Sequence, residues 1–218
     1  MYTTYSGLEF DVRRRTLNLA IGAMLAAPAL IAVSGGDARA QEAIDLEKAL
    51  GPRSIGDPDA KVTLVEYFSL TCPHCARFHA ETYPKLREKY IDTGKVRLEF
   101  RDFPLDQWAL RAAALARCVP EKHYPAIIDV LLKQQASWAR SDNPLEALLR
   151  IGQLAGLNRQ AAEACMTNGK LLDGIIASRL EGSKKHNLDS TPSFLLDGEK
   201  VRAFTFEDFE ELLAGRAT

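Results

Sequence analysis

Two cysteines separated by two residues, Cys72 and Cys75, stand where a strand pattern gives way to a helix pattern. Residues 61–68 are dense in β-branched and aromatic side chains, which predicts a short strand buried on both faces. Polar and apolar residues alternate over 95–100, which predicts a second strand. Because a helix separates the two strands, we expect them to pair in parallel as a β-α-β unit. The cysteine pair then lies at the junction between its first strand and its helix.

The helix of this unit is predicted to run from the cysteine pair to Tyr90. Thr71 is a suitable N-cap, and Pro73 is tolerated within the first turn of a helix. Pro84 lies inside the same helical pattern, so we expect it to kink the helix.

The segments around this unit predict an extended lead-in and a block of helices. Residues 41–60 contain several Gly and Pro residues and are predicted to be extended, ending in a turn. Between 105 and 188 no strand pattern occurs. The helices predicted there are 106–118, 121–135, 144–155, 159–167 and 170–187. Apolar residues at helical spacing in the last of them are expected to face the core: Leu171, Leu172, Ile175, Ile176 and Leu180.

The C-terminal part of the chain predicts a hairpin and a closing helix. An Asp197-Gly198 pair separates 193–196 from 200–204, which is typical of a hairpin with a tight turn. Thr205 with Asp208 three residues later predicts a capped helix after the hairpin. The order of elements is therefore β-α-β, a helical block, and β-β-α, which is an α/β arrangement.

Residues 1–40 have the pattern of an export signal. Three arginines at 13–15 precede an uncharged run over 17–33, and Ala38-Arg39-Ala40 places small residues where a signal peptidase reads them. We expect cleavage after Ala40. The alternative is a membrane anchor, although the apolar run is at the short end of the spanning range. The arginines also resemble a twin-arginine signal, so both export routes stay open. An exported chain would reach the periplasm, where disulfides form and persist.

The position of the cysteine pair predicts redox chemistry. At a helix start, unsatisfied N–H groups and the helix dipole favour a thiolate on Cys72 over a thiol. Such surroundings lower a cysteine pKa from about 8.5 into the range of roughly 3.5–7.5. His74, between the two sulfurs, is expected to lower the pKa further by donating a hydrogen bond or carrying charge. Cys75 is expected to be the more buried, resolving thiol, because a helix turn carries it inward.

Composition and spacing weigh against other kinds of function. The chain has 28 Lys and Arg against 29 Asp and Glu, so binding to nucleic acid through phosphate neutralisation is not expected. A metal-binding module using Cys72, Cys75, His74 and His79 is the main alternative, but no second ligand pair completes a tetrahedral site. A third hypothesis is that Cys72 and Cys75 form a purely structural disulfide in a binding protein. Neither a metal nor a cofactor is expected.

Several motifs along the chain resemble those of the DsbA-like family of thioredoxin-fold thiol:disulfide oxidoreductases. They are Gly56-Asp57-Pro58-Asp59-Ala60, the strand 62–68, Cys72-Pro73-His74-Cys75, the helical insertion, and Thr191-Pro192 before the hairpin. The resemblance covers about 54–214. It implies a thioredoxin-like fold in which 61–104 and 189–218 form one domain and 105–188 form an inserted helical subdomain.

The resemblance also implies roles for individual residues. Cys72 is expected to be the nucleophile, Cys75 the resolving thiol, and Pro192 a cis-proline that faces them. Glu66 matches the buried acid that moves protons to and from the resolving thiol, with an exposed strand carboxylate as the alternative. Pro73 and Thr191 are the expected substrate contacts.

Two departures from the dedicated oxidases leave the direction of the reaction open. His79 stands where those proteins often carry an acid, and we expect it to be a solvated helix residue. Thr191 stands where they usually have Val and is similar to what disulfide isomerases carry. Only about 20 residues separate the predicted cleavage site from the first strand, too few for a dimerisation domain. The expectation is a monomer that oxidises reduced or unfolded exported clients and is itself reoxidised by a membrane redox partner, with an isomerase or reductase as the alternative.

Cys118 and Cys165 are the two remaining cysteines. In an oxidising compartment, two leftover cysteines in one subdomain are expected to pair. A bridge of this kind also occurs in some members of the family that the chain resembles. The alternative is two separate buried thiols that act as small hydrophobic residues.

Overall fold

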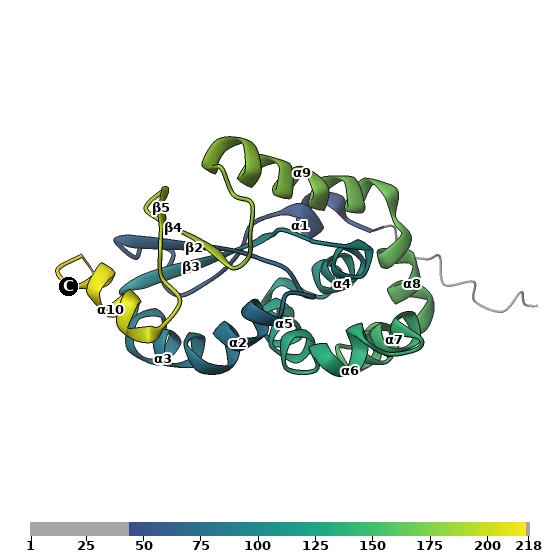
Figure 1. Cartoon of the computed structure of the whole chain (residues 1–218). Coiled ribbons are helices and arrows are strands. Elements are labelled where there is room, and N and C mark those ends of the chain that lie inside the picture. The colour runs from purple at the N-terminus through teal and green to yellow at the C-terminus, as the bar shows by residue number, and fades with distance from the viewer. Residues whose placement is uncertain (1–43, 217–218) are drawn as a thin grey trace, which may run out of the picture. The chain divides into compact units, whose positions relative to one another are not determined.

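A five-stranded sheet in the order β1-β3-β2-β4-β5 organises the protein (Figure 1). The structure is a computed structural model and describes residues 44–216. The predicted signal peptide and its cleavage site after Ala40 lie outside this range. Among the helices within it, none is both long enough and apolar enough to cross a membrane.

The predicted β-α-β unit is present. Strand β2, Val62–Phe68, pairs in parallel with β3, Val96–Asp102. Strand β4, Ser193–Leu196, lies antiparallel on the other side of β2 and continues through a tight turn into β5, Glu199–Val201. Asp197 and Gly198 both have positive φ, 50° and 88°, as a two-residue hairpin turn of this type requires.

The segment before β2 is not simply extended, so that expectation was wrong. It contains helix α1, Leu46–Leu50, and strand β1, Arg53–Ile55, which pairs antiparallel with β3. Both elements are too short to show a periodic pattern. Arg53 is also buried within β1, and a charged residue there hides the strand from a reading based on apolar side chains.

The helix that follows β2 is interrupted, as Pro84 predicts. Helix α2 covers Pro73–Glu81, α3 covers Tyr83–Leu86, and a π-helical turn continues over Arg87–Ile91. The N-cap, however, is Cys72 and not Thr71. The Thr71 hydroxyl instead donates to Asp106 Oδ2 at 2.5 Å, so it interacts with the start of the helical block and not with the first turn of α2.

The helical block agrees closely with the prediction, except that its second segment is divided. The elements are α4 Gln107–Arg117, a 3₁₀ turn Glu121–His123, α5 Tyr124–Lys133, α6 Gln135–Ala139, α7 Pro144–Leu154, α8 Arg159–Thr167 and α9 Gly169–His186. Helix α9 lies along one face of the sheet, whereas α2, α3 and the closing helix α10, Phe206–Leu213, lie on the other (Figure 1). Thr205 and Asp208 form the predicted capping box of α10.

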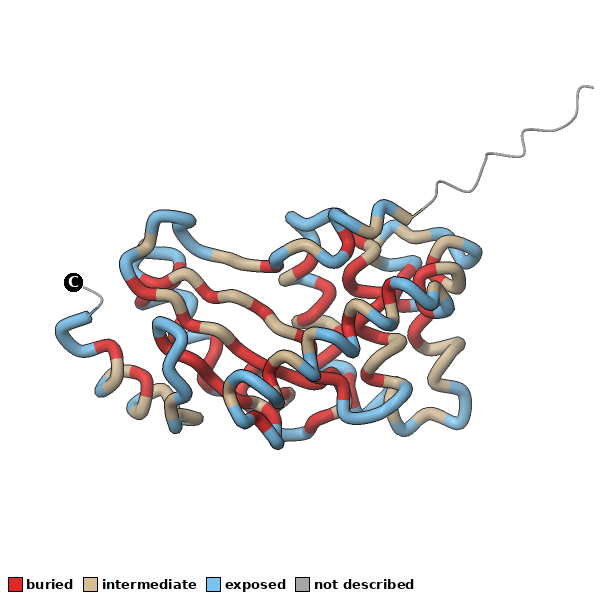
Figure 2. Tube along the Cα trace, turned by 90° about the horizontal axis from the view of Figure 1, so that it is seen from above, coloured by how far each residue is buried: buried red, intermediate tan, exposed pale blue. Residues whose placement is uncertain are grey.

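Buried residues follow the central strands and the inner faces of the helices (Figure 2). In α9 the buried face is narrower than its apolar pattern. Leu171 and Ile175 are buried, but Ile176 and Leu180 are 39% and 48% exposed, because the sheet covers only one side of this helix. The expectation that the whole stripe faces the core was therefore wrong for these two residues.

An ion pair at the junction of sheet and helices is almost completely buried. Arg117, at the end of α4, donates to Asp102, at the end of β3, and the two side chains are 6% and 2% exposed. The Arg117 Nη1 atom also donates to the carbonyl oxygens of Ala49 and Gly51, at 2.9 and 3.2 Å. A buried charge is tolerated only when it is paired and fully hydrogen-bonded, so Arg117 requires these three segments to stay together.

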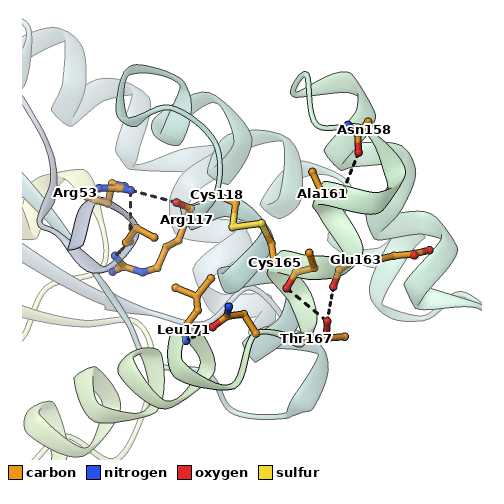
Figure 3. Close-up of a disulfide and its surroundings, with 12 residues drawn as sticks. Arg53, Arg117, Cys118, Asn158, Ala161, Glu163, Cys165, Thr167 and Leu171 are labelled. Atoms are coloured by element: carbon orange, nitrogen blue, oxygen red, sulfur yellow. Dashed lines mark hydrogen bonds between the residues drawn. A yellow bond between two sulfur atoms is a disulfide. The ribbon is translucent and has the colours of Figure 1, made fainter. Parts of the chain in front are cut away.

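A disulfide joins Cys118, directly after Arg117, to Cys165 in α8 (Figure 3). The sulfur–sulfur distance is 2.09 Å, and the Cα atoms are 6.3 Å apart. The bond closes a loop over a sequence separation of 47 residues, so it fastens α4 to α8 within the helical block.

Reduction of this bond is expected to destabilise the protein by up to about 4 kcal/mol, because the closed loop restricts the unfolded chain. The test uses a Cys72→Ser/Cys75→Ser variant, in which Cys118–Cys165 is the only possible intramolecular bridge. Urea unfolding of this variant is measured with and without a thiol reductant. Equal stability in both conditions, together with two alkylatable thiols at these positions, would contradict the bridge.

Candidate active site

The sulfur of Cys72 lies between the start of α2 and the loop before β4. Cys72 is the N-cap of α2 in an extended conformation, and no side chain caps the helix. The free N–H groups of the first turn therefore point toward this sulfur. On the opposite side, Cys72 Sγ is 3.2 Å from the carbonyl oxygen of Thr191, in position to donate to it as a thiol. Both Cys72 and Cys75 are free thiols here, so the site is in its reduced form.

The two thiols differ sharply in acidity. The pKa of Cys72 is lowered from 9.0 to about 5, chiefly by a hydrogen bond from the Cys75 thiol and then by the Thr191 side chain and the backbone N–H groups of Cys75 and His74. Burial opposes this shift but does not cancel it. Cys75 has no exposed surface, and burial raises its pKa well above 9.0, with further contributions from the bond to Cys72 and the charge of Glu66. At neutral pH the reduced site therefore contains one thiolate and one thiol.

The loop opposite the cysteines contains a cis peptide bond between Thr191 and Pro192. Thr191 is buried, and its hydroxyl oxygen has no hydrogen-bond partner within residues 44–216. Because a hydroxyl hydrogen rotates freely, this group can turn toward the Cys72 thiolate. The structure thus brings Thr191 and Pro192 to the cysteine pair, where the sequence predicted them. Pro73, the other expected substrate contact, is exposed at the first position of α2.

Glu66 is completely buried in the middle of β2, and its partner is a residue for which the prediction was wrong. Both carboxylate oxygens lie 3.0–3.1 Å from Nε2 of His79, which is only 2% exposed. His79 was expected to be solvated. It is buried because it follows Cys75 by four residues, so both side chains project from the same face of α2 toward the sheet. That spacing is the signal that could have revealed it.

His74 interacts with a residue that the sequence did not single out. Arg77 Nη2 donates to His74 Nδ1 at 3.0 Å, and the Arg77 guanidinium stacks over the ring of Phe204 with 4.8 Å to its centroid. Because a guanidinium can only donate, Nδ1 of His74 is the acceptor in this hydrogen bond. Arg77, on the next turn of α2, carries an exposed positive charge two residues after Cys75.

The helical block holds the loop that leads into Cys72. Gln135 of α6 is buried, and its Nε2 donates to the carbonyl oxygens of Leu70 and Cys72 at 2.8 and 3.0 Å. Asp106, the N-cap of α4, accepts from the Thr71 hydroxyl and from the first turn of its own helix. The sequence predicts neither contact. Gln135 and Asp106 are polar residues at the ends of helical patterns, and nothing in those patterns indicates a partner near Cys72.

The arrangement suits thiol chemistry better than metal binding. His79 is engaged with Glu66, and His74 accepts from Arg77, so neither ring turns to the cysteines. Within the described part of the chain, no group of three or more His, Cys, Asp or Glu side chains is placed to bind a metal ion.

Comparisons with known proteins agree with this geometry. A family model described as thioredoxin matches residues 48–214. A Rickettsia bellii protein provisionally named a protein-disulfide oxidoreductase is 36% identical over 152 residues, which cover 69% of this chain and 59% of that protein. The thiol:disulfide interchange protein DsbA of Burkholderia cepacia is 34% identical over 122 residues, 55% of this chain and 53% of its own.

Among solved structures, α-DsbA1 of Wolbachia pipientis superposes with a TM-score of 0.71 at 30% identity. The match covers 77% of this chain and 91% of the Wolbachia chain. By contrast, the chain spans only 59% of the length of the Rickettsia bellii relative.

The low pKa of Cys72 predicts that the reduced protein becomes more stable as the pH rises from 5 to 9. The folded-state pKa, about 5, lies below the ordinary value of 9.0, so the thiolate contributes its full stabilisation above pH 9 and loses it as the pH falls toward 5. Four pKa units correspond to an upper figure of about 5 kcal/mol. Urea unfolding of the reduced protein across this range measures the effect. In Cys72→Ser the rise should vanish, and an equal rise in that variant would refute the assignment.

Replacement of Arg77 by Gln is expected to raise the pKa of Cys72 by about half a unit, since an exposed cation near a thiolate contributes up to about 1 kcal/mol. Arg77→Lys keeps the charge and should preserve most of the effect. The matched control is Lys95→Gln, which removes an exposed charge just before β3, at the end of the parallel strands opposite to the cysteines. Ultraviolet thiolate absorbance against pH reports the pKa, and identical shifts in Arg77→Gln and Lys95→Gln would contradict a local role for Arg77.

Proposed function

The chain belongs to the DsbA-like family of thioredoxin-fold proteins, and on that basis we propose that it is a thiol:disulfide oxidoreductase that introduces disulfide bonds into exported client proteins. The main support for this proposal is the difference in pKa between the two thiols of the reduced site. Cys72 is acidic, with a pKa of about 5, whereas the pKa of the buried Cys75 is raised. A stabilised thiolate in the reduced form makes the corresponding disulfide easier to reduce, and therefore a stronger oxidant.

In the proposed reaction, a client thiolate attacks Cys72 of the Cys72–Cys75 disulfide. A client–Cys72 bond forms, the Cys72–Cys75 bond breaks, and the electron pair of the broken bond moves to the Cys75 sulfur. A second client thiolate then attacks the client sulfur of the mixed disulfide and releases Cys72 as a thiolate. The low pKa of Cys72 favours this last step, because a more acidic thiol is the better leaving group.

The surrounding residues have distinct proposed roles. Thr191 and Pro192 flank the sulfur that the client attacks, and the Thr191 carbonyl and hydroxyl are available for hydrogen bonds at that position. Pro73 is exposed at the same edge and is a second proposed client contact. His74 positions the charge of Arg77 near the site, and Glu66 supplies protons to Cys75.

The proposal also covers where the protein works and with what partners. The pattern of residues 1–40 supports export and cleavage after Ala40, which would place residues 41–218 in the periplasm. There the protein would act as a monomer on reduced or unfolded clients. Each cycle leaves Cys72 and Cys75 reduced, so a membrane redox partner must take up the electrons.

A disulfide isomerase is the second candidate, and Thr191 is the observation that favours it. Threonine before this proline is similar to what disulfide isomerases carry, whereas the dedicated oxidases usually have Val there. An isomerase must be kept reduced, whereas an oxidase must be kept oxidised.

Parallel assays on a reduced client and on a client with scrambled disulfides distinguish the two. The oxidised protein should oxidise the reduced client faster than the reduced protein restores the scrambled one. Cys72→Ser is the control and should be inactive in both assays. Efficient rescue of the scrambled client with poor oxidation of the reduced one would establish the isomerase instead.

A further inference from the structure

The buried pair of Glu66 and His79 has properties that simple packing does not require. Glu66 lies in the centre of the sheet between its register partners Phe100 and Phe194, with no exposed surface. A single nitrogen, His79 Nε2, serves both of its oxygens at 3.0–3.1 Å. Within residues 44–216 the Glu66 carboxylate makes no other hydrogen bond. His79 is therefore the group that holds this carboxylate in place.

The surroundings of the pair are aromatic. Ring centroids of Tyr83, Phe78 and Phe68 lie 4.7, 5.5 and 6.3 Å from that of His79. The second ring nitrogen, Nδ1, is buried and has no hydrogen-bond partner in the described chain. An unpaired charge is costly in such an apolar environment, and the contacts of 3.0–3.1 Å place the imidazole and the carboxylate where one can pass a proton to the other.

Cys75 is the group that needs that proton. It precedes His79 by one turn of α2 and is fully buried. Glu66 is hydrogen-bonded to His79 on the same face of α2, and its charge adds to burial and the bond to Cys72 in raising the pKa of Cys75. When a client breaks the Cys72–Cys75 bond, Cys75 leaves as a thiolate in a place where a negative charge is unfavourable.

Other titratable groups face the pair from neighbouring elements. Burial raises the pKa of Tyr83 in α3 and of Tyr124 in α5, and the charge of Glu66 adds to the shift in each case. The charged residues that act on these two tyrosines are Arg87, Asp92 and Asp129 for Tyr83, and Arg53, Asp102 and Arg117 for Tyr124. None of these residues hydrogen-bonds to Glu66, which leaves His79 as its proton partner.

We propose that His79 is a positioning residue that holds Glu66 beside Cys75 and shares with it the proton that Cys75 receives during disulfide transfer. This inference rests on the proposed function. As the client thiolate bonds to the Cys72 sulfur, the electron pair of the Cys72–Cys75 bond moves to the Cys75 sulfur, and the proton of the Glu66–His79 pair moves there. The pair then has one proton fewer and is singly negative in the dithiol form, and it takes the proton back from Cys75 when the disulfide forms again.

The test measures the rate at which reduced glutathione opens the Cys72–Cys75 disulfide, as a function of pH, after correction for the ionisation of glutathione. The variants are Glu66→Gln, His79→Gln and the double variant. His79→Gln keeps an N–H donor but cannot carry the proton.

Each single variant should react at least about tenfold more slowly than the wild type at neutral pH, because positioned proton donors contribute factors of this size or larger. The wild-type rate should fall at high pH, where the pair has lost its proton, whereas the variants should share one flat profile.

The double variant shows whether His79 acts through Glu66. It should react no more slowly than Glu66→Gln alone, because both changes interrupt the same transfer. The matched control is His123→Gln, which removes an exposed histidine from the turn Glu121–His123 and should leave the profile unchanged. A wild-type rate and profile in His79→Gln would overturn the proposal, and so would a double variant slower than Glu66→Gln.

A second measurement needs no change at the pair. The chain has four histidines, so nitrogen NMR can follow each ring, with assignments from Gln substitutions at His74, His123 and His186. The protonation of His79 should differ between the disulfide and dithiol forms, whereas that of His123 should not. An unchanged His79 would overturn the proposal even if His79→Gln fails to fold. Because glutathione replaces the client, failure to oxidise protein clients would refute the proposed function while leaving these results interpretable.

Discussion

The placement of the Cys72 sulfur between a helix start and a backbone carbonyl is the constraint on which the rest of the site depends. Strand β2 places Cys72 at the first turn of α2, and β4 pairs with β2 so that Tyr67 is opposite Ser193. Continuing this antiparallel register brings the loop before Cys72 opposite Thr191. The approach of Thr191 to Cys72 is therefore a consequence of the sheet order, and a change of register would separate them.

The same geometry makes the two thiols unequal. The helix turn that leaves Cys72 at the N-terminal edge carries Cys75 under the sheet, where burial raises its pKa. The charge that Cys72 can carry is stabilised by Cys75 itself, whose thiol donates the main hydrogen bond. A site with two equally exposed cysteines would lack this polarity, because either sulfur could then be attacked. Burial of Cys75 directs the client to Cys72 and also creates the need for a proton inside the protein.

Much of the fold could be predicted from the sequence because its signals are local. β-branched runs mark β2 and β3, and Asn143, Asn158 and Thr205 each cap the helix that follows, as expected from their side chains. Three of the failures share one physical cause. Arg53, His79 and Gln135 are polar residues that the structure buries because distant segments supply their partners. A pattern based on polarity assigns such residues to the surface. For His79 the spacing from Cys75 could have indicated burial, whereas for Arg53 and Gln135 only the partner in a distant segment does so.

These long-range partners connect the helical block to the chemistry. Gln135 fixes the carbonyl of Cys72, which also accepts the first hydrogen bond of α2 from Ala76 at 3.2 Å. The residue that carries the reactive sulfur is thus held by α2 and by α6 together. At the far end of α4, the Arg117–Asp102 ion pair fastens the helical block to the sheet. The disulfide between Cys118 and Cys165 connects α4 to α8 within the block (Figure 3). Because α4 begins at Asp106, which binds Thr71, one helix runs from the edge of the active site to the disulfide. The contacts from α6 and Asp106 therefore help to hold the Cys72 sulfur at the first turn of α2 and beside Thr191, whose side chain adds to the hydrogen bond from Cys75 in lowering the pKa of Cys72.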